Sequence, residues 1–168
     1  MSIIWNKYTA IGYNNKLFKM IDCISSLDSR LLYCKIQDNN NEIFNIFSIY
    51  MPTSPDVWYK YYNKLYEFVK IDNNTIVMGD FNCYYNGLID HNPQIYHIPK
   101  NGIILKEIIS NLNLIDLCRF HKTKENLNTR IDKGKKVTTR IDHIYCSNDV
   151  IQLSSPSYIE SWNGSDHM

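Results

Sequence analysis

Residues 75–82 read Thr-Ile-Val-Met-Gly-Asp-Phe-Asn, a short apolar run followed by a mostly polar tetrapeptide. The run comes directly after the turn-forming triplet Asp72-Asn73-Asn74, so it predicts a buried strand with two polar side chains at its carboxyl end. Taken alone, Gly79-Asp80-Phe81-Asn82 is more typical of an ordinary turn that closes a strand, because Gly, Asp and Asn favour turns for backbone reasons.

Two further acidic motifs have the same design. Arg140-Ile141-Asp142-His143 and Ser165-Asp166-His167 each place a carboxylate beside an imidazole at the expected end of an apolar strand. Upstream, Tyr50-Met51-Pro52 closes another such strand. Carboxylates with amide or imidazole neighbours can hold a hard divalent cation and activate a water beside a phosphate. The three motifs in series, with the tyrosine motif before them, are much harder to explain as turns than one motif.

The rest of the chain predicts a mixture of strands and helices. Alternating or β-branched runs indicate strands, and apolar stripes at helical spacing indicate helices, the first of them opened by Ser54-Pro55-Asp56. The expected strands cover residues 8–13, 17–24, 31–37, 43–50, 75–78, 114–117, 138–146 and 158–162, and the expected helices cover 55–69 and 103–112. Residues 83–100 are interpreted as a surface loop. With neither a linker nor a repeat, the chain is expected to form one α+β domain over residues 1–168.

Charge is distributed unevenly along a chain whose formal net charge is only +1. Between Arg119 and Arg140 there are 8 basic and 2 acidic residues, so the rest carries 18 − 8 = 10 basic and 17 − 2 = 15 acidic residues, a net charge of −5. This basic segment is consistent either with a local contact to phosphate or with a solvated loop. We predict nucleic-acid contacts from Arg119, Lys122, Lys124, Lys133, Lys135, Lys136 and Arg140.

The remaining composition narrows the class of protein. A hydrophobic content of 44 % indicates a packed globule rather than a disordered segment. The 5 cysteines are widely spread without zinc-site spacing, so we expect no structural zinc and a reducing compartment. Neither a signal peptide nor a membrane span is recognisable, so an intracellular protein is expected, with the nucleus a plausible location and no membrane partner.

Four motifs in order resemble those of the endonuclease/exonuclease/phosphatase superfamily: Ile49-Tyr50-Met51-Pro52, Gly79-Asp80-Phe81-Asn82, Arg140-Ile141-Asp142 and Ser165-Asp166-His167. Within it, residues 114–119, Thr129 and residues 139–144 make the chain most similar to the apurinic-type endonuclease domain of non-LTR retrotransposons. The resemblance implies a DNase I-like fold, a two-sheet β-sandwich flanked by helices in four αββα layers. It also implies hydrolysis of DNA phosphodiesters with Mg²⁺, or Mn²⁺, as cofactor and DNA as partner.

The same resemblance gives roles to residues whose chemistry suits them. Asp80 would orient or deprotonate the attacking water, and Asn82 would donate an amide hydrogen bond to a phosphate oxygen. His167 would be the phosphate donor or acid/base group, with Asp142 fixing its tautomer. Tyr50 would give its hydroxyl to phosphate, and Asp166 would offer a carboxylate to the metal. On the strand 138–146, alternation predicts Arg140 and Asp142 on one face.

The chain departs from the family pattern at both ends, so the domain is expected to be truncated there. The superfamily begins with an Asn-bearing strand, a helix and a strand that ends in a metal-binding Glu, and nothing before Tyr8 supplies them. Loss of that Glu predicts weak or no activity. A non-catalytic nucleic-acid-binding remnant and a phosphatase of the same superfamily therefore remain alternatives. The retrotransposon-like segment 114–119 argues against the phosphatase.

Overall fold

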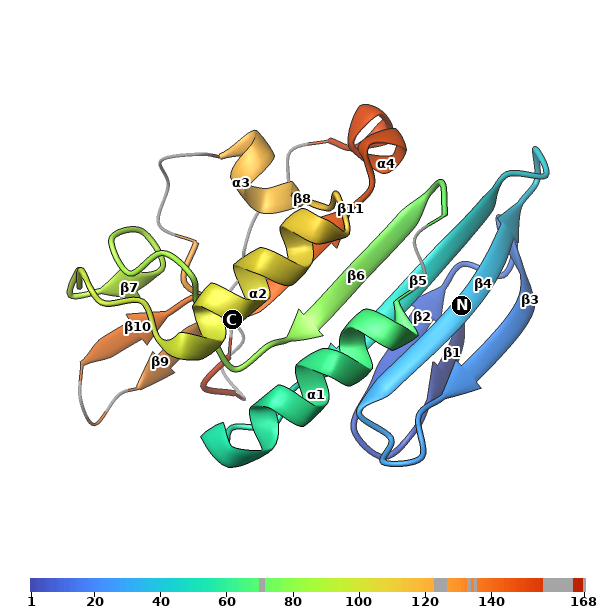
Figure 1. Ribbon diagram of the computed structural model, residues 1–168. Helices are drawn as coiled ribbons and strands as arrows, with labels where there is room; N and C mark the ends of the chain where they lie inside the picture. Colours follow the sequence, from blue (N-terminus) through green and yellow to red (C-terminus); the bar gives the residue numbers. More distant parts are fainter. Residues whose placement is uncertain (70–71, 123–126, 133, 135, 156–164, 168) are drawn as a thin grey trace.

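The computed structural model describes residues 1–69, 72–122, 127–132, 134, 136–155 and 165–167. Its centre is a six-stranded sheet in the order β3-β4-β5-β6-β11-β8 (Figure 1). The bounds are β3 Phe18–Ser25, β4 Leu31–Asp38, β5 Ile43–Tyr50, β6 Thr75–Asp80, β11 Asp142–Cys146 and β8 Ile115–Asp116. All neighbouring pairs are antiparallel except β5 and β6, which are parallel. The expected α+β class is confirmed.

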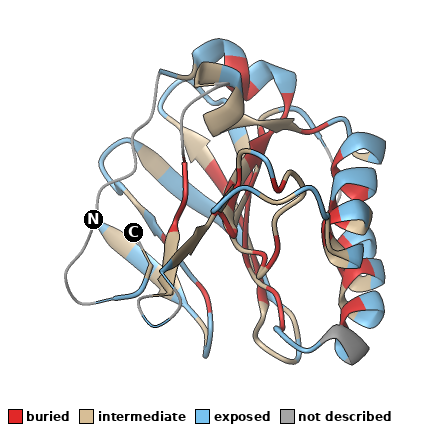
Figure 2. Ribbon diagram, turned by 90° about the vertical axis from the view of Figure 1, so that its left-hand side faces the viewer, coloured by how far each residue is buried: buried red, intermediate tan, exposed pale blue. Residues whose placement is uncertain are grey.

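The parallel pair requires a crossover, and the helix α1 (Pro55–Phe68) supplies it. Helix α2 (Lys100–Asn111) lies beside α1 on the same face of the sheet, and Figure 2 shows both helices on one side of the sheet and the amino-terminal end of the chain on the other. Both helices were predicted from their apolar stripes. There are also two short helices: α3 (Leu117–His121) comes directly after β8, and α4 (Asn148–Leu153) follows β11.

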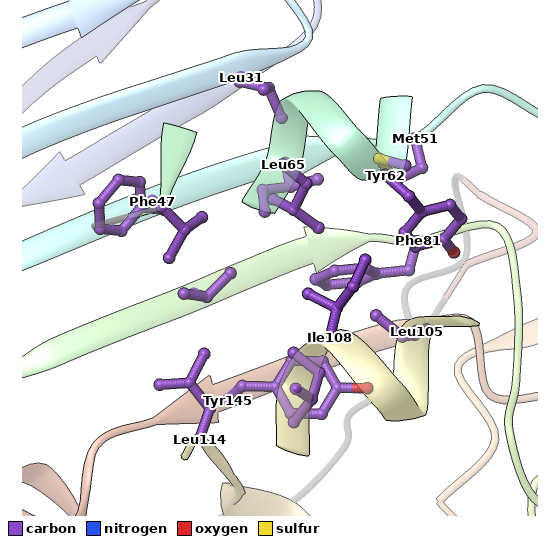
Figure 3. Packing of buried hydrophobic residues seen from close by; sticks show 14 of the residues in the cluster. Leu31, Phe47, Met51, Tyr62, Leu65, Phe81, Leu105, Ile108, Leu114 and Tyr145 are labelled. Carbon is purple, nitrogen blue, oxygen red and sulfur yellow. The ribbon is translucent and has the colours of Figure 1, made fainter. Parts of the chain in front are cut away.

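The main core lies between these two helices and the sheet. Figure 3 shows Tyr62 and Leu65 of α1 and Leu105 of α2 packed against Phe47 of β5 and Tyr145 of β11. Because side chains alternate across a strand, the next residues along β5 face the other way, where Ile46 joins a second cluster. Burial on both faces explains why β5 and β6 read as nearly continuous apolar runs.

Two small sheets complete the described part. The hairpin β1 (Ser2–Trp5) and β2 (Ala10–Tyr13) brings Ile11 onto the second cluster. The strands β7 (His91–Asn92), β10 (Val137–Thr139) and β9 (Arg130–Asp132) form a three-stranded sheet in that order.

The strands expected over residues 138–146 and 158–162 are not described as single strands. The strand expected over 138–146 is two strands, β10 and β11, interrupted at Arg140 and Ile141. The strand expected over 158–162 lies outside the described residues. No helix in the described part of the chain is long and apolar enough to cross a membrane.

Candidate active site

Three neighbouring strands bring the first two acidic motifs and the tyrosine motif together. Asp80 at the end of β6 pairs with Asp142 at the start of β11, and Tyr50 at the end of β5 pairs with Asp80 on its other side. Paired residues of adjacent strands point to the same face of a sheet. Tyr50, Asp80 and Asp142 thus form a row across the sheet, on the face opposite the two long helices.

His167 joins this row from the far end of the chain. Its Nδ1 lies 2.9 Å from Asp142 Oδ2, and the ligand atoms of Asp80, Asp142 and His167 all lie within 4.8 Å of one another. Pairing with β9 holds the residue there: Arg130 and His167 form an isolated antiparallel bridge, and the Ile131 N–H donates to the Asp166 carbonyl at 2.8 Å.

The electrostatics of the row suit a cation. Two carboxylates placed directly opposite each other in an antiparallel pair repel. Burial raises the pKa of Asp80 to about 6; a hydrogen bond from the Asn82 N–H opposes this rise, and the nearby Asp142 carboxylate adds to it. Two carboxylates and an imidazole are a donor set for Mg²⁺ or Mn²⁺, with Mn²⁺ the better match to an imidazole nitrogen.

Thr129 holds the Asp142 carboxylate in place. Its hydroxyl donates to Asp142 Oδ2 at 2.6 Å and accepts from the backbone N–H groups of Ile141 at 3.2 Å and Asp142 at 3.0 Å. Both hydrogen bonds to the Asp142 carboxylate, from Thr129 and His167, use Oδ2, and no hydrogen bond within the described residues reaches Oδ1. Sequence reasoning used Thr129 only as a mark of resemblance and missed this contact.

Asn82 supports the site in a way the sequence did not predict. Its backbone N–H donates to Asp80 Oδ1 at 2.8 Å, and its side-chain amide donates to the Met51 carbonyl at 2.7 Å. Asn82 adopts a positive φ of 48°, which a turn asparagine tolerates. One amide hydrogen of Asn82 is therefore committed to the backbone after β5, and the other remains for the predicted contact with phosphate.

Asp166 is not part of the group formed by Asp80, Asp142 and His167. Its half-exposed carboxylate lies 3.3 Å from Arg130 Nε instead, and the hydrogen bond from Arg130 lowers the pKa of Asp166. The metal-binding role expected of Asp166 stays a prediction, and in this structure its carboxylate pairs with Arg130 of β9.

Two of the residues predicted to contact nucleic acid have buried, paired side chains in the structure. The side chain of Arg140 is 1 % exposed, and its Nη1 and Nη2 donate to the two Asp116 carboxylate oxygens at 2.8 and 2.6 Å. Arg119, 11 % exposed, pairs with the fully buried Asp90. A buried guanidinium must be paired, so neither side chain is offered to a ligand at the surface. Because β10 and β11 are separate strands, Arg140 and Asp142 do not share the expected face.

The structure describes only two of the five lysines that were predicted to contact nucleic acid. Lys136 is exposed and Lys122 is partly exposed, whereas Lys124, Lys133 and Lys135 lie outside the described residues. The sequence analysis did not predict the burial of Asp90, because Asp90 lies in the segment 83–100 that was interpreted as a surface loop. Its backbone carbonyl also accepts from the Arg140 N–H at 2.8 Å, so this segment packs against the start of β11.

This chain is similar to several known proteins. A Xenopus laevis protein, the transposon TX1 uncharacterized 149 kDa protein, is 26 % identical over an alignment of 158 residues that covers 89 % of this chain and 12 % of that protein. The chain thus spans about an eighth of the length of this curated relative.

Among solved structures, a 3′-5′ exonuclease (NExo) from Neisseria meningitidis has a TM-score of 0.72 at 18 % identity and covers 88 % of this chain and 68 % of its own. NExo is also known bound to a product DNA hairpin, with a TM-score of 0.64 at 19 % identity over 80 % of this chain and 61 % of that one. The endonuclease domain of TRAS1, a telomere-specific non-LTR retrotransposon, has a TM-score of 0.66 at 15 % identity, and the match covers 99 % of this chain and 74 % of that one. At these identities the likeness establishes the fold.

The fold and the order of the motifs agree with one family. The Endonuclease/Exonuclease/phosphatase family pattern matches residues 9–167, nearly the whole chain, and the chain therefore belongs to this family.

Proposed function

We propose that this chain hydrolyses phosphodiester bonds in DNA with the help of Mg²⁺ or Mn²⁺, as a retroelement-type endonuclease. The observation that carries the proposal is the convergence of Asp80, Asp142 and His167 within 4.8 Å from three separate parts of the chain. The similarity to a transposon protein and to the fold of the TRAS1 endonuclease domain supports DNA as the substrate.

Asp80 and Asp142 would hold the cation through the carboxylate oxygens that other residues do not use. When bound, the cation supplies charge neutralisation for the phosphate and lowers the pKa of a coordinated water. Nδ1 of His167 donates to Asp142, so Nε2 is the nitrogen that would serve as the third donor to the cation or donate to the phosphate.

The protein residues would carry out the proton transfer. Asp80 would orient or deprotonate the attacking water beside the bound cation. Asp142 accepts from Nδ1 of His167, which leaves Nε2 to face the substrate. The free amide hydrogen of Asn82 and the Tyr50 hydroxyl would donate to phosphate oxygens.

Nicking of supercoiled plasmid in Mg²⁺ or Mn²⁺ tests the proposal. The variants Asp80→Ala and His167→Ala should lose activity, and the exposed Asp22 of β3 provides a matched control in Asp22→Ala. Equal activity in the parent and both site variants would refute the catalytic assignment.

The alternative is DNA binding without hydrolysis. It is favoured by the pairing of Asp166 with Arg130, because only two carboxylates then gather at the row among the described residues. Salt-dependent DNA binding with no nicking in either metal would support this alternative.

A further inference from the structure

Beside the active-site row lies Arg30, a cation with no carboxylate partner among the residues that the structure describes. Arg30 immediately precedes β4, and its guanidinium carbon is 4.8 Å from the ring centre of Tyr8, 5.0 Å from that of Tyr50 and 5.8 Å from that of Tyr61. Within the described residues, the one hydrogen bond of this guanidinium runs from Nη1 to the Tyr50 carbonyl at 3.4 Å. No acidic group of the described chain forms an ion pair with it.

The acidic residue nearest in sequence is already occupied. Asp28 accepts from the Ser26 hydroxyl at 2.7 Å, and its other oxygen lies 3.0 Å from Lys64 Nζ of α1. The Asp28 carboxylate is thus paired with Lys64, and no carboxylate among the described residues pairs with the Arg30 guanidinium.

A second cation approaches the same ring. Lys7 Nζ lies 5.0 Å from the ring centre of Tyr8, so Tyr8 is flanked by two cations, neither of which has a carboxylate partner in the described part of the protein. Aromatic faces stabilise cations but do not neutralise them. Two like charges gathered in this way favour an anion between or beside them.

The position of this cluster relative to the active site follows from the strand pairing. The Tyr50 N–H donates to the Arg30 carbonyl at 2.9 Å, and Tyr50 is paired in turn with Asp80. Arg30 therefore stands two strand spacings, about 10 Å, from Asp80 in the same row. A nucleic-acid strand whose reacting phosphate lies at Asp80 would bring a neighbouring phosphate to Arg30.

We propose that Arg30 and Lys7, held around Tyr8, bind a backbone phosphate of the nucleic-acid strand next to the one that reacts. This inference rests on the proposed function for its ligand. The guanidinium offers a planar fork of donors that matches phosphate oxygens, and ring contacts hold it in one orientation. Lys7 adds a second charge. The site is distinct from the basic segment 119–140.

Binding of a fluorescent single-stranded oligonucleotide in EDTA tests the site without any hydrolysis. Removing one phosphate contact should weaken binding about tenfold and lower the slope of log affinity against log salt by about 0.7. We expect this result for Arg30→Gln, and a smaller loss with an unchanged slope for Arg30→Lys. Lys19→Gln removes an exposed charge at the opposite end of the β3–β4 pair, opposite Gln37, and should change neither quantity.

The results of these binding assays can refute the phosphate site independently of the proposed hydrolysis. Parent-like binding by Arg30→Gln, an equal loss in Lys19→Gln, or no binding by the parent chain would overturn the phosphate site. If Arg30→Gln loses binding while the parent never nicks plasmid, the site stands and the hydrolysis fails. If Arg30→Gln is unfolded by circular dichroism, the exposed Lys7→Gln decides, and it must reproduce both the weaker binding and the lower slope.

Discussion

Thr129 and Asp142 are joined by a 2.6 Å hydrogen bond from the threonine hydroxyl to Oδ2, the same oxygen that faces Nδ1 of His167. The same hydroxyl accepts from two backbone N–H groups at the start of β11. One side chain thus fixes both the beginning of the strand and the orientation of its carboxylate.

Thr129→Val should therefore impair stability and activity together. The change keeps the volume but leaves two N–H groups without an acceptor, which costs about 1–3 kcal/mol of unfolding free energy. Losing a hydrogen bond that orients an active-site carboxylate should lower the nicking rate about 10–100-fold. Urea unfolding and plasmid nicking measure the two effects. Thr53→Val, at an exposed threonine, should leave both unchanged; parent-like behaviour of Thr129→Val would contradict the role given to the hydroxyl.

Asp80→Asn should stabilise the metal-free protein at neutral pH. The folded-state pKa of Asp80, about 6, lies above its ordinary value of 3.8, so the folded state binds the proton more tightly than the unfolded state. The ionised carboxylate thus costs stability as pH rises from about 4 to 6, by up to about 3 kcal/mol. The gain from Asp80→Asn should be full at pH 7 and absent below pH about 4. Urea unfolding in EDTA at both pH values tests this; a pH-independent difference would contradict it.

Arg140→Gln should destabilise the fold rather than weaken a surface contact. It leaves Asp116 and Asp90 buried without their shared cation, a loss of about 3–5 kcal/mol in unfolding free energy. Lys136→Gln, at an exposed position, should leave the unfolding free energy nearly unchanged. Equal urea midpoints for the two variants would show that the buried network contributes nothing.

Gly79→Ala should separate β5 from β6 at the active-site row. Gly79 has a φ of +140°, and an added Cβ would lie 2.0 Å from the Ile49 carbonyl oxygen. The clash is with backbone, so we expect a loss of about 3 kcal/mol or more and, in any folded fraction, loss of nicking. Gly12→Ala is the control, because its Cβ would meet nothing closer than 3.9 Å. Thermal unfolding compares them, and similar melting temperatures would refute the close approach.

The sequence was sufficient where a feature depended on local pattern. Apolar stripes predicted α1 and α2, and the motifs at strand ends brought Asp80 and Asp142 into one site because their strands are neighbours in the sheet. The prediction that Arg140 and Asp142 share a face failed because the strand is interrupted at Arg140, where the guanidinium is buried. Asp90 could not be foreseen, since its burial depends on Arg119 and Arg140, roughly 30 and 50 residues further along the chain. Such pairs are set by tertiary packing, which local pattern does not encode.

Asp80, Asp142 and His167 are proposed to form one divalent-cation site. Titration of the purified chain with Mn²⁺, followed by electron paramagnetic resonance at pH 7, measures it directly. We predict one bound Mn²⁺ per chain, lost in Asp142→Asn and retained in the exposed-surface variant Asp22→Asn. No bound Mn²⁺ in the parent chain, or equal binding in parent and Asp142→Asn, would show that these three residues do not form a cation site.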